Sequence, residues 1–193
     1  MERNDNLVQI LAILYLLSEY GRLGRYQISK TLKLGEGVVR RILKYLKDEG
    51  LIVSSKGGSS LTLKGKRFLR KLFDKFNIKK MREVNVTKVV GSDYLGVGIC
   101  CKALLGDILR IRDEAVRGGA EGALILKFEG GRLVMPYMDS EAVPVLQDFI
   151  ESITKIFEPS EGDIVIIGFN KDLGRALVGA IRAALLSCKS RCQ

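Results

Sequence analysis

The first part of the chain shows helical patterns of apolar residues separated by short polar corners. Residues 6–20 are apolar on almost every side, which predicts a central helix that ends at Gly21. A shorter helix is expected over Arg25–Leu32, followed by a tight corner over residues 33–37, where glycine supplies a positive φ. The pattern therefore predicts two helices, the second leading into a helix-turn-helix corner.

A third helix is expected over Glu36–Asp48, and its apolar positions recur at helical spacing. The stripe that we expect to pack inward consists of Val39, Ile42, Leu43 and Leu46. Gly50 is the expected C-terminal cap, and a strand follows up to Ser55. We expect Lys56–Ser60 to form a flexible basic hairpin tip, followed by the returning strand Leu61–Leu63.

A basic amphipathic helix is then expected from Lys64 to about Phe76. Its apolar stripe consists of Leu69, Leu72, Phe73 and Phe76, which could pack on their own domain or on a partner. The charges of the chain are concentrated in this first part. The first 80 residues carry 18 Lys and Arg against 7 Asp and Glu, whereas the remaining 113 carry 14 against 15. An excess of +11 in one segment indicates a polyanionic partner, because Lys and Arg side chains near phosphates release condensed counterions.

The run from Val38 to Ile52, followed by Leu61 to Lys66, resembles the recognition helix, wing and following helix of archaeal and bacterial winged-helix transcription regulators. The resemblance covers about residues 6–76. It implies a winged helix-turn-helix domain over residues 1–80, double-stranded DNA as partner, and a homodimer that reads two half-sites. It also suggests that the helix after the wing contributes to dimerisation.

The expected DNA-binding residues follow from this docking geometry, in which the third helix enters the major groove by its N-terminal half. Arg40 and Arg41 are the candidates for guanine readout, because a guanidinium can bond to O6 and N7 together. The remaining candidates are Gly37 and Val38 for close approach or a thymine methyl, and Lys44, Lys47 and Lys56 for phosphates. The alternative is that these residues only solubilise a polar helix face.

Residues 81–193 mix strands, helices and frequent glycine, which predicts an α+β sandwich. Expected strands are 84–90, 96–102, 123–128, 132–136 and 163–169, and expected helices are 105–117, 141–157 and 171–189. Without the first strand and the last helix the order is βαββαβ, that of a ferredoxin-like sheet with helices on one face. Residues 112–123, 127–128 and 132–136 resemble a C-terminal domain of uncharacterised function in archaeal predicted winged-helix regulators, which implies a regulator of unknown ligand.

Two places in this second part could bind a small-molecule effector. Asn170, Lys171 and Arg175 lie where a strand meets a helix N-terminus, which favours anions. The simpler interpretation is a strand-to-helix turn with Asn170 or Asp172 as N-cap. The second place is a set of opposite charges at helical spacing, for which a solvated ion-pair face is the alternative: Arg112, Asp113, Glu114 and Arg117.

The cysteines and the absence of histidine limit the metal-binding and catalytic chemistry that we expect of the chain. Cys100, Cys101, Cys188 and Cys192 lack the CxxC spacing of a zinc site, and only one of the adjacent pair is expected to point inward. The chain contains no His, and we find no P-loop, nucleophile elbow or HExxH motif. We therefore expect no cofactor, no metal and no enzymatic activity.

The longest apolar stretch, residues 7–17, is too short to span a bilayer, and its flank is unlike a secretory leader. We expect a cytoplasmic protein without membrane contact. The leading hypothesis is a sequence-specific DNA-binding transcription regulator with a C-terminal sensor or dimerisation domain. Two alternatives stay open: a winged-helix head fused to an uncharacterised small-molecule enzyme, and an architectural protein that binds DNA without sequence preference.

Overall fold

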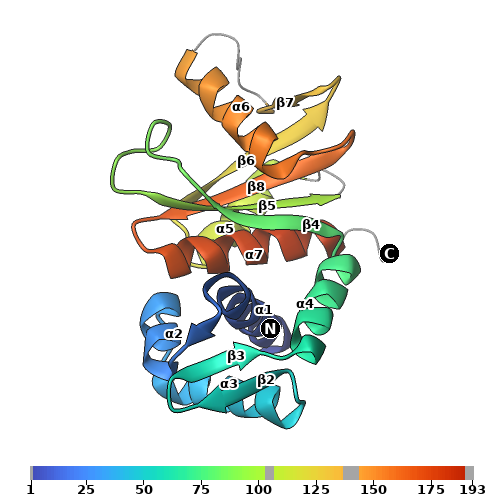
Figure 1. The fold of residues 1–193 in the computed structure, drawn as a ribbon. Coiled ribbons are helices and arrows are strands. Elements are labelled where there is room, and N and C mark those ends of the chain that lie inside the picture. Colours follow the sequence, from blue (N-terminus) through green and yellow to red (C-terminus); the bar gives the residue numbers. More distant parts are fainter. Residues whose placement is uncertain (1, 103–106, 137–143, 190–193) are drawn as a thin grey trace. The chain divides into compact units, whose positions relative to one another are not determined.

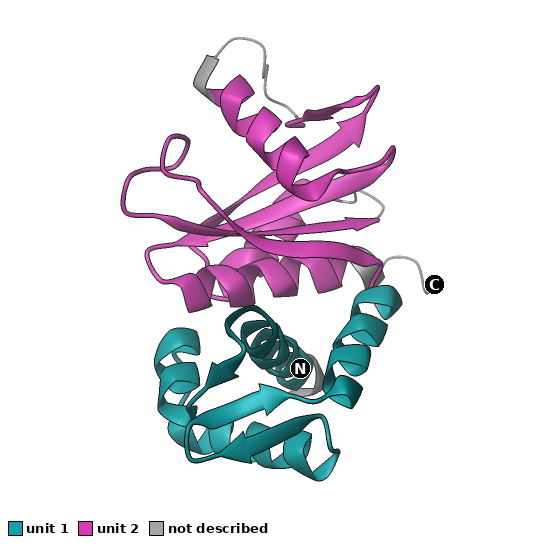
Figure 2. Cartoon of the chain, viewed as in Figure 1, with its two compact units in different colours: residues 1–75 teal, residues 76–193 magenta. Residues whose placement is uncertain are grey.

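The chain forms two compact units, residues 1–75 and 76–193, in a computed structural model (Figures 1 and 2). The structure describes residues 2–102, 107–136 and 144–189. The boundary expected between residues 80 and 81 falls inside β4 (Ile78–Val84), a strand of the second unit.

The first unit combines four helices with a small three-stranded sheet. Its elements are α1 (Glu2–Tyr20), β1 (Arg22–Leu23), α2 (Arg25–Leu32), α3 (Glu36–Asp48), β2 (Ile52–Ser55), β3 (Gly58–Leu61) and α4 (Leu63–Lys75). The sheet order is β1-β3-β2, and both pairs are antiparallel. The predicted bounds of α2 and α3 are confirmed, whereas β1 was not expected because a strand of two residues has no visible periodicity.

Helix α3 follows the predicted amphipathic pattern with one exception. Val39, Ile42 and Leu46 are buried, but Leu43 is only partly buried, so the prediction that it packs inward is wrong. Gly50 takes φ 67°, and its N–H donates to the carbonyl of Lys47 at 2.8 Å. This left-handed residue turns the chain sharply out of α3 and into β2.

The hairpin between β2 and β3 is tighter than expected. Ser55 pairs directly with Gly58, which leaves a turn of only Lys56 and Gly57. Gly58 has φ +119°, and a Cβ there would lie 2.5 Å from the carbonyl oxygen of Leu23 in β1. Glycine at this position lets β1 pair with β3, so Gly58 to Ser60 belong to a strand and not to the flexible tip that we predicted.

Helix α4 begins with a side-chain cap. The N–H of Gly65 donates to Oγ1 of Thr62 at 2.9 Å, and this hydroxyl donates to the carbonyl of Gly50 at 2.8 Å. Thr62 thereby joins the start of α4 to the end of α3. Leu69 and Leu72 of the expected apolar stripe are buried in the chain itself.

The second unit is a five-stranded antiparallel sheet with helices on both faces. Its elements are β4, β5 (Leu95–Lys102), α5 (Ile108–Arg117), β6 (Gly122–Glu129), β7 (Arg132–Val134), α6 (Pro144–Phe157), β8 (Asp163–Asn170) and α7 (Leu173–Lys189). The sheet order is β4-β5-β8-β6-β7. Helices α5 and α7 pack on one face, and α6 crosses the other (Figure 1). The α+β class is therefore correct.

The ferredoxin-like expectation is wrong in two respects. That arrangement would keep the helices on one face and would place the strand corresponding to β5 between those corresponding to β8 and β7. Here β8 lies between β5 and β6, and α6 covers the face opposite α5 and α7. The strand predicted over 84–90 is also misplaced, because β4 ends at Val84. The expected starts of α5 at Leu105 and α6 at Glu141 lie outside the described residues.

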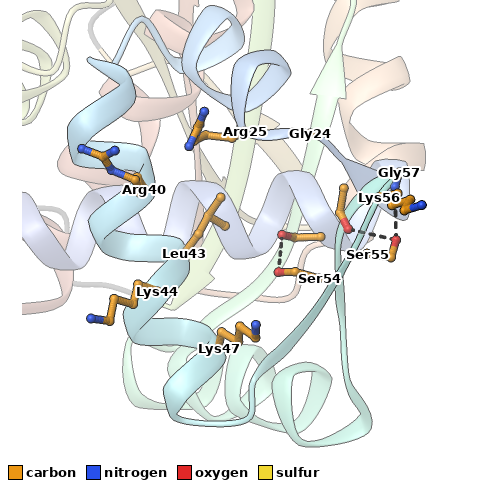
Figure 3. A pocket seen from close by; sticks show the side chains of 12 residues that line it. Gly24, Arg25, Arg40, Leu43, Lys44, Lys47, Ser54, Ser55, Lys56 and Gly57 are labelled. Atoms are coloured by element: carbon orange, nitrogen blue, oxygen red, sulfur yellow. Dashed lines mark hydrogen bonds between the residues drawn. The ribbon is translucent and has the colours of Figure 1, made fainter.

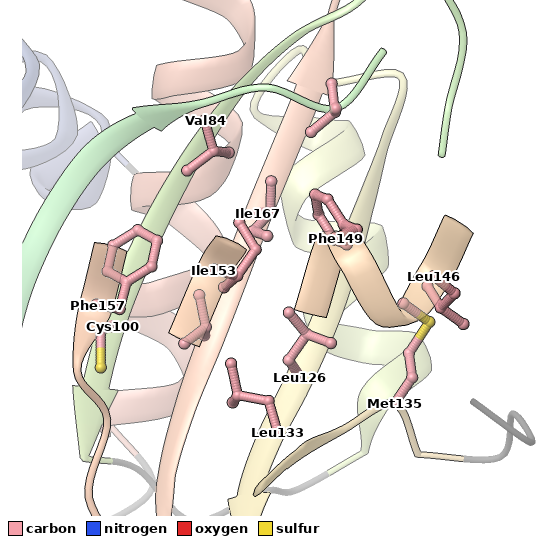
Figure 4. Close-up of a cluster of buried hydrophobic side chains, with 12 residues drawn as sticks. Val84, Cys100, Leu126, Leu133, Met135, Leu146, Phe149, Ile153, Phe157 and Ile167 are labelled. Carbon is pink, nitrogen blue, oxygen red and sulfur yellow. The ribbon is translucent and has the colours of Figure 1, made fainter. Parts of the chain in front are cut away.

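A hydrophobic cluster holds α6 on its face of the sheet (Figure 4). Phe149, Ile153 and Phe157 of α6 are buried against strand residues such as Leu126. A Cβ at Gly98 of β5 would lie 2.6 Å from the ring of Phe157, so glycine makes room for this ring. Elsewhere in the fold, no helix of the described residues is long and apolar enough to cross a bilayer.

Candidate functional site

A hollow of about 490 Å³ lies between α3, the β2–β3 hairpin and the start of α2 (Figure 3). Its lining residues are Gly24, Arg25, Arg40, Leu43, Lys44, Lys47, Ser54, Ser55, Lys56, Gly57, Gly58 and Ser59. We call this hollow the α3–hairpin groove. All three of its walls belong to the first unit.

The groove is cationic. Its lining contains two arginines and three lysines, all exposed, and no acidic residue is among the described residues that line it. Arg40, Lys44 and Lys47 are spaced by four and three residues, which places them on one face of α3. Because these like charges are concentrated in one concave place, the groove has a positive electrostatic potential.

The structure separates the seven residues that we expected to bind DNA. Arg40, Lys44, Lys47 and Lys56 line the groove. Gly37, Val38 and Arg41, also on α3, do not belong to the lining. Consecutive residues of an α-helix point about 100° apart, so Arg41 lies on the far side of Arg40 from Leu43 and Lys47 and falls outside the lining.

Sequence reasoning missed Arg25 and Leu43 as groove residues. Arg25 is the first residue of α2 and reaches the groove only because the helix-turn-helix corner brings α2 beside α3. Leu43 was assigned to the core from its period, but it lies at the border between the buried stripe of α3 and the groove, and it lines the groove. For Arg25 the available signal was its place directly after Gly24, at a helix start close to the corner.

The hairpin contributes small polar residues to the groove. The hydroxyls of Ser54 and Ser59 face each other across β2 and β3, with their oxygen atoms 3.0 Å apart. At the turn, the N–H of Gly57 donates to Oγ of Ser55 at 3.3 Å. Small side chains leave the backbone of this wall close to the groove surface, where a ligand could approach it.

One carboxylate lies near the groove without lining it. Oε2 of Glu36, in the first turn of α3, is 3.6 Å from Nε of Arg25. Both side chains are about half exposed, at 55% for Glu36 and 50% for Arg25. The pair connects the starts of α2 and α3.

The second predicted site is a well-bonded strand-to-helix turn. Nδ2 of Asn170 donates to the carbonyl of Gly119 at 2.9 Å, and Oδ1 of Asn170 accepts from the N–H of Asp172 at 2.8 Å. Asp172 caps α7 by accepting from the N–H of Gly174 at 3.1 Å. The Asn170 amide is thus used inside the fold, as the simpler interpretation predicted.

The two cations of that predicted site have neighbours of their own. Nζ of Lys171 lies 4.0 Å from Oδ2 of Asp93 and 5.8 Å from the centre of the Tyr94 ring. The Arg175 side chain passes beside Gly119, where a Cβ would lie 3.6 Å from it. These contacts within the fold therefore account for the positions of Lys171 and Arg175 at the turn.

The charged set on α5 forms an ion-pair network with α7. Oε1 of Glu114 accepts from Nη2 of Arg182 at 2.7 Å, and Oε2 lies 3.3 Å from Nη1 of Arg117. Burial by itself would raise the pKa of Glu114, but the hydrogen bonds and charges of the two arginines bring its pKa below the ordinary value. Arg112 and Asp113 form no ion pair with another described residue.

Cys100 and Cys101 are both buried, which corrects the expectation that only one points inward. Both faces of the sheet are covered by helices, so adjacent strand residues are buried on opposite faces. Burial, followed by the nearby charge of Asp163, raises the pKa of Cys100 to about 12, so its thiol is protonated and unreactive at neutral pH.

The other two thiols, on Cys188 and Cys192, lie outside the described side chains. Among the residues that the structure describes, no three Cys, Asp or Glu side chains converge on a point that could hold a metal ion.

Comparison with known proteins finds a family model that matches each of the two units. A family model described as the PH0730-like N-terminal domain matches residues 6–67, and a domain of unknown function (DUF4443) matches residues 97–188. Among curated proteins, none matches the chain. A solved structure, the hypothetical protein PH0730 from Pyrococcus horikoshii OT3, is similar with a TM-score of 0.76 and 34% identity, covering 96% of this chain and 94% of that one.

The expected two-domain architecture is therefore confirmed, together with a relative of archaeal origin. The regulatory role stays a prediction. Because identity and coverage are both high over nearly the whole length, the chain belongs to the family of the hypothetical protein PH0730 and carries its PH0730-like N-terminal domain followed by the domain DUF4443.

Proposed function

We propose that the first unit is a winged helix-turn-helix domain that binds duplex DNA, and that the chain is a sequence-specific transcription regulator. The observation that carries the proposal is the α3–hairpin groove, with five cations and no acid among its described lining residues. The element order also supports it, because α2, α3 and the β2–β3 hairpin follow one another as helix, recognition helix and wing.

In this proposal α3 enters the major groove of DNA and the hairpin lies along the neighbouring backbone. The hollow between them then receives the phosphates of one strand. Lys44, Lys47 and Lys56 neutralise these phosphates and fix the position of the protein without reading sequence. Arg40, closer to the start of α3, is the candidate for a bidentate bond to guanine.

The proposal includes a homodimer, because regulators of this type read two half-sites about 34 Å apart. The second unit is the candidate for dimerisation. Its helix α5 presents two large apolar side chains to solvent, Leu109 at 68% and Val116 at 48% exposure, and they lie two turns apart on one side of the helix. The small-molecule effector of a sensor domain stays a prediction, since the turn around Asn170 is explained by its own hydrogen bonds.

Selection from a pool of random duplex DNA tests the proposal. Sequence-specific regulation predicts an enriched motif with two half-sites. An Arg40→Ala variant should lose the motif or a base within it, whereas Arg70→Ala should keep it. Arg70 is an exposed arginine of α4 outside the groove lining, so its substitution removes the same charge from the same unit.

The opposite outcomes separate the alternatives. Salt-sensitive binding without any enriched motif would replace specific regulation by an architectural role. Equal losses in the two arginine variants would show that net charge, and not the groove, determines binding.

A further inference from the structure

Glu36 stands at the beginning of the groove face of α3. It is followed at spacings of four, three and four residues by Arg40, Leu43 and Lys47, all of which line the groove. Residues at this spacing share one side of a helix, so the groove face of α3 begins with a carboxylate and continues with cations. Within α3 the other acid is Asp48, at the opposite end of the helix.

The carboxylate of Glu36 is accessible. Its side chain is 55% exposed, and it pairs with Nε of Arg25 at 3.6 Å, which is longer than a hydrogen bond. Arg25 therefore balances part of its charge and leaves the carboxylate oxygens able to accept bonds from a ligand. The α3 N-terminus also favours a negative charge here, because Gly35 provides no side-chain cap.

A carboxylate at this position weakens the binding of phosphates. It repels phosphates, and it also repels the guanine O6 and N7 and thymine O4 atoms that face the major groove as acceptors. Among the base edges of the major groove it finds an isolated donor only at N4 of cytosine, because the amino group of adenine lies beside the acceptor N7.

We propose that Glu36 is a specificity-determining residue that accepts a hydrogen bond from N4 of a cytosine in each half-site. The inference rests on the proposed DNA-binding function and deepens it, because it names a base that the recognition helix requires. Glu36 would thus lower affinity for DNA that lacks this cytosine and raise discrimination, as repulsive groups do in other specific interfaces.

The test is the same random-duplex selection, performed with the full chain and with Glu36→Gln and Asp48→Asn. The two substitutions remove the same charge from the two ends of one helix. The wild-type motif should contain a cytosine that Glu36→Gln no longer requires, while the rest of the motif persists and Asp48→Asn keeps the cytosine. On the selected site, changing that C·G pair to T·A should weaken the wild type roughly tenfold and the glutamine variant less than about twofold.

Each other result has a defined meaning. A motif that Glu36→Gln leaves unchanged, or that Asp48→Asn alters equally, overturns the role of Glu36 while the DNA-binding proposal stands. A wild-type protein that enriches no motif overturns both.

Loss of the helix-start charge could also destabilise α3, so unfolding midpoints are measured under the binding conditions. Glu36→Asp provides a second variant, because it keeps the charge but withdraws the carboxylate by one methylene. It should lose the preference for cytosine as well, and an unchanged preference would overturn the proposal.

Discussion

The α3–hairpin groove leads to a quantitative prediction about salt. If Arg40 binds guanine and each of the other four groove cations neutralises one phosphate, the slope of log affinity against log salt should be about −3.6 for one copy of the first unit. Lys44→Ala removes one of the four and should reduce the slope to about −2.7. Between 50 and 200 mM salt the affinity should therefore fall roughly 150-fold for the wild type and roughly 40-fold for the variant.

The assay is fluorescence anisotropy of a labelled short duplex, titrated at four or five salt concentrations. A dimer on two half-sites doubles both slopes but keeps their ratio, so the comparison does not depend on oligomeric state. Lys71→Ala is the matched control, because Lys71 is an exposed lysine of α4 outside the groove lining.

The reasoning would be refuted in either of two ways. A wild-type slope shallower than about −2 would mean that the groove cations do not contact phosphates. A slope that changes equally in the Lys44 and Lys71 variants would mean that the protein binds through its overall charge, and the groove would lose its role.

Three further predictions concern the fold. Phe157→Ala empties a buried site of the α6 cluster and should lower the free energy of unfolding by about 3–5 kcal/mol in urea titrations, and a loss below about 1 kcal/mol would show that α6 does not need this ring. Thr62→Val removes the cap of α4 and should lower the free energy of unfolding by about 1 kcal/mol. The control Thr87→Val, at an exposed turn of the second unit, should lower it by less. Because the pKa of Glu114 is below its ordinary value of 4.5 in the folded chain, its ion pairs stabilise above that pH and are lost as the pH falls through the lower, folded value. The stability gap between wild type and Glu114→Gln should therefore be largest at neutral pH and should close below pH 4.5; a gap that is independent of pH would contradict the assignment.

Much of the first unit could be predicted from the sequence because its signals are local. The bounds of α2 and α3 follow from apolar spacing and from the corner between them, and both agree with the structure. Four of the seven expected DNA-binding residues line one groove, because three of them share a face of a single helix. The strand β1 gave no such signal, since two residues cannot show a period and pairing with β3 depends on glycine at position 58.

In the second unit, the sequence determined which segments form strands and helices better than it determined their arrangement. The hairpin of β6 and β7 was predictable because its strands are adjacent in the chain. The place of β8 between β5 and β6 was not, because that pairing joins residues far apart in sequence. The burial of both Cys100 and Cys101 followed only from helices covering both faces of the sheet.

The sequence by itself thus determined the helices of the first unit, the concentration of positive charge there, and the absence of histidine chemistry. Only the tertiary structure decided which cations meet. It brought Arg25 of α2 to the groove and within 3.6 Å of Glu36 of α3, and it left Arg41 outside the groove lining. The physical reason is that periodicity specifies which side of an element is apolar, whereas the surface opposite each polar side depends on contacts between elements distant in the chain.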